Sequence, residues 1–554
     1  MIATTRQTVF ARLRAQRFDL LIIGGGIVGA GIARDAAMRG LKVALIEQGD
    51  FASGTSSKTS KLIHGGLRYL EHGRVRLVFE SLRERQVLRT IAPALVHPIS
   101  LLLPIYEGGS RPAWRINLGL WLYDLLAYRR NIRPHRMVSA RRALALEPGL
   151  RLDGLRAAGL YADCQMDDAR VCLANILQAV SFGAVCCNYV RLHALLKSEG
   201  RICGGAAQDV LSGRSLDIHA QVVVNAAGPW ADQVRRLSDA SAVQRLAPTK
   251  GIHLVVPRLT QEALFVEARR DRRMLFLLPW GEYSLIGTTE APLEDSLETL
   301  RARPDEVGYL LEEVNRILPG SHLDEDAIIA TYAGARPLLA FSGASTHASR
   351  EHRIEVDRSG LVSVMGGKYT TYRRMAQQAV DFLLTTHHWK MEKTERCLTD
   401  QVSLLEIVHP VVLENWQEVT RAVDPDLLAR LLTRYGAGAF HILKLLSQDQ
   451  RLAQSVCPHH EYIAAELVHA FQQERACTMS DVLVRRTQIA WSSCQGLDAL
   501  SMLMDLFERY GELSHVQMEH QVDEYHKFLA RSLAFRSPVS SPRDGTAVER
   551  SDRP

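Results

Sequence analysis

The sequence predicts an α/β fold, in which a parallel sheet opens the chain, an antiparallel sheet is interleaved with it and an all-α region follows. Residues 18–23 form an apolar run of the length of a buried strand. Glycines, a helical pattern over 27–39 and a second apolar run over 42–46 complete a strand–helix–strand unit. Between about 405 and 532 the periodicity is helical. Further β-type runs occupy residues 221–225, 253–257, 274–279, 283–287 and 361–365, and the middle three lie close together, as in an antiparallel sheet.

Length and composition indicate an ordinary globular protein of several domains. The 554 residues exceed what one compact core holds, and 47% of them are hydrophobic. The net charge of +6 is small for this length and gives no reason to expect nucleic-acid binding. No apolar run reaches the roughly 20 residues of a membrane span, and we find no secretory signal. The nine cysteines show no CxxC spacing, so we expect neither a disulfide framework nor a metal site. Unpaired cysteines fit a reducing compartment, so we expect a cytoplasmic protein.

Composition also marks the expected ends of the folded part. Residues 1–17 carry four arginines and read as a flexible basic lead-in. Residues 533–554 are rich in proline, serine and charge and are predicted to be a disordered tail. Between them we expect one α/β unit over 18–395 and a helical domain over 396–532.

A glycine fingerprint lies between the first strand and the first helix. Gly24, Gly26 and Gly29 form GxGxxG, and the second strand ends in the acid Glu47, which is the full context of a Rossmann-like dinucleotide site. The first glycine permits the tight turn, the second lets a pyrophosphate approach the backbone, and the third lets helix and strand pack closely. Glu47 can accept hydrogen bonds from ribose hydroxyls. Gly25, Ile27 and Gln48 belong to the same predicted site.

Two features favour FAD over NAD as the ligand. The fingerprint starts with three glycines near the N-terminus, and a second strand, far downstream, ends in Ala227-Gly228. That second strand brings bare backbone to the same ligand.

The loop over residues 54–73 combines small, hydroxyl and charged side chains. A polar surface loop is the alternative interpretation. Gly65-Gly66 allows close backbone approach, whereas His64, Arg68 and Tyr69 bring acid–base and anion-binding chemistry. The cofactor-binding residues that we predict in this loop are Thr55, Ser56, Lys61, Leu62, Gly65 and Gly66.

This loop closely resembles the signature of the FAD-dependent glycerol-3-phosphate dehydrogenases, the quinone-linked respiratory enzymes. The resemblance runs from about residue 18 to about residue 530. Lys58-Thr59 departs from the family pattern, which has small residues there, and the link over 396–400 lacks the usual Pro-Gly. The other matching motifs are DDAR at 167–170, KGIHLVVP at 250–257, IGTTE at 286–290, TYAGARPL at 331–338, GGKYTTYR at 366–373 and DVLVRRT at 481–487.

The resemblance implies a D-amino-acid-oxidase-like architecture with a C-terminal cap domain over 396–532. The implied FAD lobe takes residues 18–100, 160–230 and 345–395. The implied substrate lobe takes mainly residues 101–159 and 231–344.

The resemblance also implies a reaction: oxidation of sn-glycerol 3-phosphate to dihydroxyacetone phosphate in glycerol catabolism, with FAD taking two electrons. Arg68, Arg350 and Lys368 resemble the family's phosphate-binding residues, and Tyr69 lies beside the first of them. A base must take the hydroxyl proton; we choose His64, with His253 as its competitor.

Two further features of the implied site concern charge. Arg336 stays protonated and is expected to orient the substrate oxygen. Gly366-Gly367 and Lys368 precede a predicted helix, whose N-terminus would stabilise the reduced flavin anion.

Residues 111–136 are the candidate contact with a membrane. Six arginines accompany one aspartate, and Trp114, Leu118, Trp121, Leu122 and Leu125 fall at helical spacings. An interfacial helix on the inner face of the cytoplasmic membrane, close to ubiquinone, is one interpretation. An ordinary amphipathic helix packed on the flavin unit is the other.

Other functions remain open at this stage. A glycerol-3-phosphate oxidase that uses O₂, or another oxidase of the same scaffold, fits the same motifs. A non-catalytic flavin-binding regulatory protein is the alternative from a different class. The oligomeric state is also undetermined by the sequence, and a homodimer is one possibility.

Overall fold

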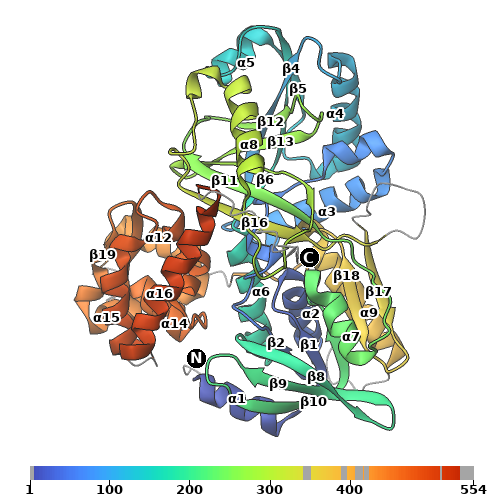
Figure 1. The fold of residues 1–554 in the computed structure, drawn as a ribbon, viewed down its shortest axis with the longest axis vertical. Helices are drawn as coiled ribbons and strands as arrows, with labels where there is room; N and C mark the ends of the chain where they lie inside the picture. The colour runs from blue at the N-terminus through green and yellow to red at the C-terminus, as the bar shows by residue number, and fades with distance from the viewer. Residues whose placement is uncertain are drawn as a thin grey trace, which may run out of the picture.

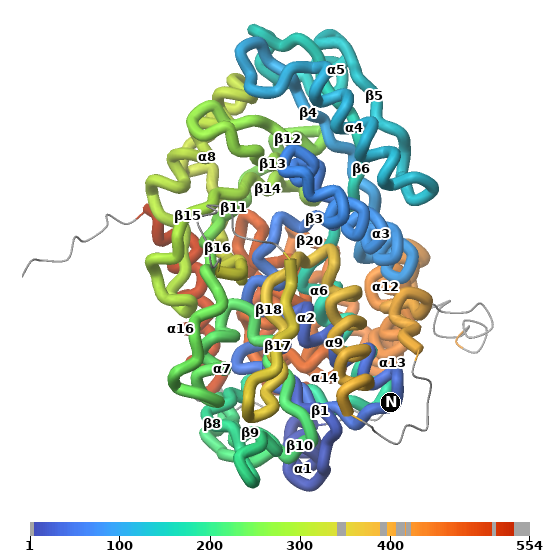
Figure 2. The backbone as a smooth tube through the Cα atoms, turned by 90° about the vertical axis from the view of Figure 1, so that its right-hand side faces the viewer, coloured from blue at the N-terminus to red at the C-terminus, as the bar shows by residue number. Residues whose placement is uncertain are grey.

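The computed structural model describes residues 5–340, 351–387, 396–405, 416, 423–511 and 515–536. Two large sheets form two lobes that are stacked along the long axis of the molecule, and the C-terminal helices lie beside their junction (Figures 1 and 2). Both sheets and the helical C-terminal region agree with the sequence prediction. Within the described residues, no helix has the length and apolar composition needed to cross a bilayer.

The first sheet is the predicted parallel one. The four pairings β10–β1, β1–β2, β2–β7 and β10–β18 are parallel, whereas β17 runs antiparallel to β18. A β8–β9 hairpin extends it, with β9 paired to β10. The strand order is β17 (His352–Val356), β18 (Val362–Gly366), β10 (Ser215–Asn225), β1 (Arg17–Ile23), β2 (Val43–Ile46) and β7 (Val185–Cys187), and the hairpin strands are β8 (Val190–Ser198) and β9 (Arg201–Asp209).

Alternate side chains of β1 enter different cores. Leu20 and Ile22 pack with the helices α2 (Ile27–Met38), α6 (Asp168–Ser181) and α9 (Tyr372–Thr386). Leu21 and Ile23 face the opposite side. This is why residues 20–23 of the strand are all apolar, as both faces of a parallel sheet are covered.

The helix α1 (Arg6–Ala15) covers that opposite side and corrects one prediction. Its Val9 and Leu13 are buried against the first sheet, and the Thr5 side chain caps it by accepting from the N–H of Thr8. The described part of the expected flexible lead-in is therefore an ordered element. The prediction failed because it relied on the basic composition of this segment and overlooked two apolar residues, Val9 and Leu13, that lie four positions apart on one helix face.

The second sheet is mostly antiparallel and curves over the cavity described below. One face packs on α8 (Pro304–Ile317) and α5 (Ala140–Leu146), and the other on α3 (Val75–Ile91) and α4 (Ala113–Ala127). Its strand order is β15 (Ala291–Pro292), β11 (Thr249–Pro257), β14 (Tyr283–Gly287), β13 (Met274–Trp280), β12 (Ala263–Glu267), β4 (Val96–Tyr106), β6 (Leu155–Met166) and β3 (Leu62–Ile63), with β16 (Ala330–Arg336) on β11 and β5 (Arg136–Ser139) on β6.

The chain crosses between the two lobes at points that differ from those predicted. Both β3 and the end of β6 belong to the second sheet, although residues 18–100 and 160–230 were expected in the FAD lobe. The reason is that β4 and β6 pair continuously from Val96–Met166 to Tyr106–Leu155, so neither strand changes sheet midway.

The C-terminal region is helical, with one short hairpin that the periodicity did not predict. Strands of three and four residues leave no periodic signal. Its elements are α12 (Pro425–Tyr435), α13 (Ala439–Gln448), β19 (Ser455–Cys457), β20 (His460–Ile463), α14 (Ala464–Gln472), the turn η9 (Asp481–Arg486), α15 (Leu500–Tyr510) and α16 (His515–Ser532). We call residues 423–536 the cap.

The end of the cap also corrects a prediction. Residues 533–536 were expected in the disordered tail, but the turn η12 (Ala534–Arg536) follows α16 there. Phe535 is 3% exposed and packs into the core between the second sheet and α8. The rest of the predicted tail, 537–554, lies outside the described residues.

Candidate active site

A cavity of about 910 Å³ lies between the two sheets. The ends of β1, β2, β10 and β18 open into it from one side, and β11 and β16 from the other. Most of the predicted site residues line it. They are Gly24, Gly26, Ile27, Glu47, Gln48, Thr55, Ser56, Leu62, His64, Gly66, Arg68, Tyr69, Ala227, Gly228, His253, Arg336, Gly366, Gly367 and Lys368.

The glycine turn after β1 has no room for side chains. Gly24 has φ 113°, and a Cβ there would lie 2.6 Å from the carbonyl oxygen of Ala226. A Cβ on Gly29 would lie 2.0 Å from the carbonyl oxygen of Gly24, so strand and helix are packed backbone to backbone. The start of α2 is thereby held at the cavity wall, where Ser56 Oγ accepts from the N–H of Ile27 at 2.9 Å. Such a cradle suits the pyrophosphate of a dinucleotide.

Glu47 ends β2 beside this turn. Its carboxylate accepts from the N–H of Gly25 at 2.7 Å and from the N–H of Gly49 at 2.8 Å. Burial raises the pKa of Glu47, while these two backbone donors oppose the rise. The carboxyl group is fixed at the cavity wall, where it can accept from ribose hydroxyls. The donor and acceptor set at this end of the cavity therefore fits FAD.

Three cationic residues, Arg68, Arg336 and Lys368, line the cavity. The Lys368 ammonium lies 3.8 Å from the centroid of the Tyr69 ring and 3.3 Å from Ser81 Oγ. Arg336 donates to Thr288 Oγ1 at 2.8 Å and to the carbonyl oxygen of Thr289 at 3.0 Å, which fixes its guanidinium. Arg68 lines the same cavity. This arrangement suits a small dianion.

Both candidate bases line the cavity. His64 packs edge-on against Phe276, with ring centroids 6.2 Å apart. His253 is stacked on Tyr332 at 4.9 Å, and its Nε2 lies 2.9 Å from Ser60 Oγ. Burial, Arg336 and Lys61 lower the pKa of His253 well below its ordinary value, so its ring is neutral at pH 7.

A few predicted site residues lie elsewhere. Gly25, Gly29, Lys61 and Gly65 are not among the residues that line the cavity. The Lys61 ammonium is buried in an ion pair with Asp168 at 2.6 Å, and the N–H of Gly65 donates to the hydroxyl oxygen of Tyr123. Arg350 lies outside the described residues.

Some lining residues were missed by the sequence prediction. Lys58, Arg485 and Arg531 reach the cavity from three distant parts of the chain. Burial, Arg485 and Arg531 lower the pKa of Lys58 to about 8. The sequence offered weak indications for two of them: Lys58 departs from the family pattern, and Arg485 lies in a motif that matches the family. For Arg531 the sequence offered no indication.

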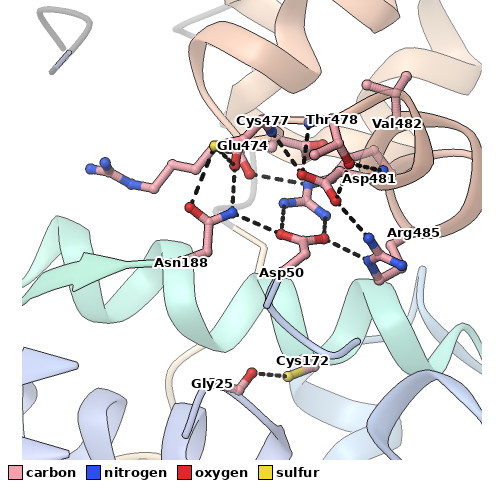
Figure 3. Close-up of polar contacts among 12 residues, drawn as sticks. Gly25, Asp50, Cys172, Asn188, Glu474, Cys477, Thr478, Asp481, Val482 and Arg485 are labelled. Atoms are coloured by element: carbon pink, nitrogen blue, oxygen red, sulfur yellow. Dashed lines mark hydrogen bonds and ion pairs between the residues drawn. The ribbon is translucent and has the colours of Figure 1, made fainter. Parts of the chain in front are cut away.

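The cap is bonded to the loop that carries Glu47 (Figure 3). Asp50 accepts from Arg485 Nε at 2.6 Å and from Arg486 at 2.7 and 2.9 Å, and Asn188 Nδ2 donates to it at 2.9 Å. Burial opposes ionisation of Asp50, but Arg486 and Arg485 outweigh it and hold its pKa well below the ordinary range. The Tyr189 hydroxyl donates to Asp481 at 2.7 Å across the same junction.

Both the α/β unit and the helical C-terminal region match known protein families. Residues 19–373 match the family of FAD dependent oxidoreductases, and residues 362–517 match the C-terminal domain of alpha-glycerophosphate oxidase. The chain is 36% identical over 548 residues to a glycerol-3-phosphate dehydrogenase of Synechocystis, which covers 94% of this chain and 98% of that one. The chain belongs to the FAD-dependent glycerol-3-phosphate dehydrogenase family. The human mitochondrial glycerol-3-phosphate dehydrogenase is 32% identical over 558 residues, 96% of this chain and 76% of that one.

Two solved structures have the same fold. The Bacillus halodurans glycerol-3-phosphate dehydrogenase complexed with FAD superposes with a TM-score of 0.77 at 28% identity, over 97% of this chain and 99% of that one. The L-alpha-glycerophosphate oxidase of Mycoplasma pneumoniae with FAD bound, at 18% identity, shares the fold over 69% of this chain and 98% of its own with a TM-score of 0.54. The predicted family, fold class and cofactor, FAD, are confirmed, and the chain is an FAD-dependent oxidoreductase.

Proposed function

We propose that this chain oxidises sn-glycerol 3-phosphate to dihydroxyacetone phosphate and passes the electrons to a membrane quinone, as an enzyme of glycerol catabolism. One observation carries the proposal: a single cavity is lined by the dinucleotide fingerprint, by three cations and by two histidines. FAD, when bound, supplies the acceptor for the hydride that leaves the carbinol carbon.

The cations are proposed to bind different parts of the substrate. Arg68 and Lys368 are proposed to hold the phosphate, the first as a bidentate donor and the second as a point charge. Arg350, outside the described residues, is the third proposed phosphate ligand. Arg336, held by Thr288 and Thr289, is proposed to orient the substrate oxygen and to stabilise the negative charge that develops on it.

The hydroxyl proton needs a base at the same place. We assign it to His64, whose ring lines the cavity beside Phe276. His253 is the competitor, because its depressed pKa keeps the ring unprotonated. Its Nε2, however, already lies at hydrogen-bond distance from Ser60 Oγ.

An exposed apolar stripe on α4 supports the membrane acceptor. The stripe is formed by Trp114, Leu118, Trp121 and Leu125, each more than 60% exposed, at helical positions that share one face. Apolar side chains of this size and exposure on one helix face mark an interaction surface. Arginines flank the stripe in the sequence at 111, 115, 129, 130, 133 and 136.

A further exposed aromatic side chain lies on α3, next to one of these arginines. Phe79 is 44% exposed, and the Arg130 guanidinium lies 5.5 Å from the centroid of its ring. Aromatic and leucine side chains bordered by arginine are typical of a surface that lies in the interface of an anionic membrane. We therefore propose peripheral attachment through α4, with quinone as the acceptor.

The oxidation is tested with the purified holoenzyme under anaerobic conditions. Addition of sn-glycerol 3-phosphate should bleach the visible flavin absorbance, whereas glycerol should not. Unchanged absorbance at saturating substrate would contradict the proposed substrate. In air, an oxidase would form one H₂O₂ per substrate oxidised; a quinone-linked enzyme forms far less and speeds up with a soluble quinone.

The membrane surface is tested by sedimentation with anionic vesicles at low salt. Trp121→Glu and Leu118→Glu should abolish binding, while Val243→Glu, at a residue that is 67% exposed and lies outside α3 and α4, should not. Equal vesicle binding by all of these variants would exclude α4 as the contact.

A further inference from the structure

Two cysteine thiols meet in the cap, away from the residues that line the cavity. Cys457 ends β19, and Cys494 lies in the loop after the turn η10 (Ile489–Trp491). Their Sγ atoms are 3.5 Å apart, although the residues are 37 positions apart in sequence. No metal-binding motif was predicted here because the two thiols come from separate segments.

A carboxylate lies beside the thiols, and an imidazole lies beside the carboxylate. One ligand atom each from Cys457, Cys494 and Asp498 lies within 4.8 Å of the others. His459 Nε2 lies 4.0 Å from Asp498 Oδ2. A tetrahedral zinc ion with Zn–S bonds of about 2.3 Å requires two sulfur ligands about 3.8 Å apart, which is close to the observed separation.

The surroundings support the two thiols as ligands. The N–H of His459 lies 3.4 Å from Cys457 Sγ and donates to it, and Ser492 Oγ lies 3.3 Å from Cys494 Sγ. Such outer contacts hold thiolate ligands in place. Cys457 is 2% exposed, whereas the side chains of His459 and Asp498 are 40% and 47% exposed. The cluster therefore has a buried base and a solvent-accessible rim, by which an ion can reach it.

We propose that Cys457, Cys494 and Asp498 form a binding site for a thiophilic divalent cation, with zinc as the best fit, and that His459 stands at its rim as the outer partner of Asp498. Two sulfurs and one carboxylate oxygen supply three of the four ligands of a tetrahedral zinc ion, and the fourth position lies on the exposed side, where His459 contacts Asp498. The ion would cross-link the β19–β20 hairpin to the segment 489–499.

The cross-linked segment contacts the substrate lobe. Gln495, next to Cys494, donates to the carbonyl oxygen of Ile329, immediately before β16. The ion would thus fix the loop that attaches the cap to the second sheet, and its role is to stabilise the cap. This site is independent of the proposed oxidation.

The experiment uses the full-length holoenzyme, purified under reducing conditions and dialysed against zinc or cobalt. Wild type should retain one zinc per chain, and cobalt should give a thiolate charge-transfer band. Cys457→Ser and Cys494→Ser should lose both signals. The matched control is Cys203→Ser, at a half-buried cysteine of β9, which should behave as wild type.

Thermal unfolding gives the second readout. Zinc should raise the unfolding temperature of wild type and of Cys203→Ser, because a ligand that binds the native state stabilises it by mass action. If the cysteine variants do not fold, Asp498→Ala and His459→Ala, on the rim, replace them. These should lower zinc affinity by at least about tenfold, which is what even outer-shell partners contribute.

Three results would overturn the site. One is wild type without bound metal after dialysis, and another is unchanged metal content in Cys494→Ser. The third is a Cys457–Cys494 disulfide in the freshly purified protein, found by peptide mapping without reductant; that bond requires the sulfurs to approach to about 2.05 Å.

Discussion

The cavity and the cap junction are built in opposite ways. The cavity wall is made of contiguous segments in which backbone approaches a ligand, such as the turn from Gly24 to Gly29. The junction is made of side chains whose partners lie far apart in sequence, such as Asp50 with Arg486 and Arg170 with Glu474. Close backbone approach requires glycine at fixed spacings, whereas a buried ion pair requires only that folding brings two charges together. The cavity wall can therefore be predicted from the sequence, whereas the ion pairs of the cap junction cannot.

The two regions also differ in what a substitution does. An added Cβ in the glycine turn meets backbone that cannot move aside. Removal of one partner of a buried ion pair leaves a charge without compensation, which costs about 3–5 kcal/mol although the intact pair adds little. The following experiments separate these effects.

The largest effect is expected in the glycine turn. Gly29→Ala places a Cβ 2.0 Å from the carbonyl oxygen of Gly24, so α2 and β1 must separate and the cradle is lost. The variant should be purified without flavin or fail to accumulate as folded protein. Gly308→Ala is the control, in α8, where an added Cβ meets no atom within 4 Å. A flavin content equal to wild type in Gly29→Ala would refute the packing argument.

The next effect concerns the junction. Asp50→Ala leaves Arg486 buried without its carboxylate, while Arg485 keeps only its second partner, Asp481, so the free energy of unfolding should fall by about 3–5 kcal/mol. Denaturant unfolding followed by flavin fluorescence measures it. The control Glu107→Ala breaks the exposed pair with Arg156, where both side chains are over 60% exposed, and should change stability by less than about 1 kcal/mol. Equal losses in both variants would show that burial of the pair is irrelevant.

A pH effect is expected in the cap. Burial, with His441 and Arg170, lowers the pKa of His469 to about 4, and Glu474 opposes the shift. Between pH 4 and the ordinary value near 6.5, the unfolded chain binds a proton that the native chain does not. Stability should therefore fall as the pH is lowered through this window, by about 3 kcal/mol from this residue.

Unfolding of His469→Gln against pH measures that contribution, because the variant should have a flatter profile between pH 6.5 and 4. His193→Gln, at an exposed position of β8, is the control and should keep the wild-type slope. An unchanged slope in His469→Gln would assign the acid sensitivity to other groups.

The smallest effect belongs to substrate binding. Arg68→Ala should remove a charge-assisted contact of about 1.5–3 kcal/mol, which corresponds to a 10- to 150-fold lower kcat/KM for sn-glycerol 3-phosphate. Flavin content should stay at the wild-type level. Arg156→Ala, at an exposed arginine of β6, serves as the control. Full activity of Arg68→Ala would remove this residue from the phosphate site.

The sequence alone determined the α/β fold with its helical addition, the family and FAD, and most of the site residues that it predicted line the cavity. These features depend on local chemistry: glycines where backbone must approach closely, apolar runs where both sheet faces are covered, and cations set among small residues. The apolar stripe of α4 was also predictable, because Trp114, Leu118, Trp121 and Leu125 follow helical spacing.

Only the tertiary structure decided which distant residues meet. Val9 and Phe535, from segments predicted to be flexible, are buried in two cores. Lys61, predicted to bind the cofactor, forms an ion pair with Asp168 instead. The tertiary structure also brought Lys58 near Arg485 and Cys457 near Cys494. The physical reason is that a side-chain pair carries no spacing rule: its partners are chosen by the packing of whole elements, which no short segment encodes.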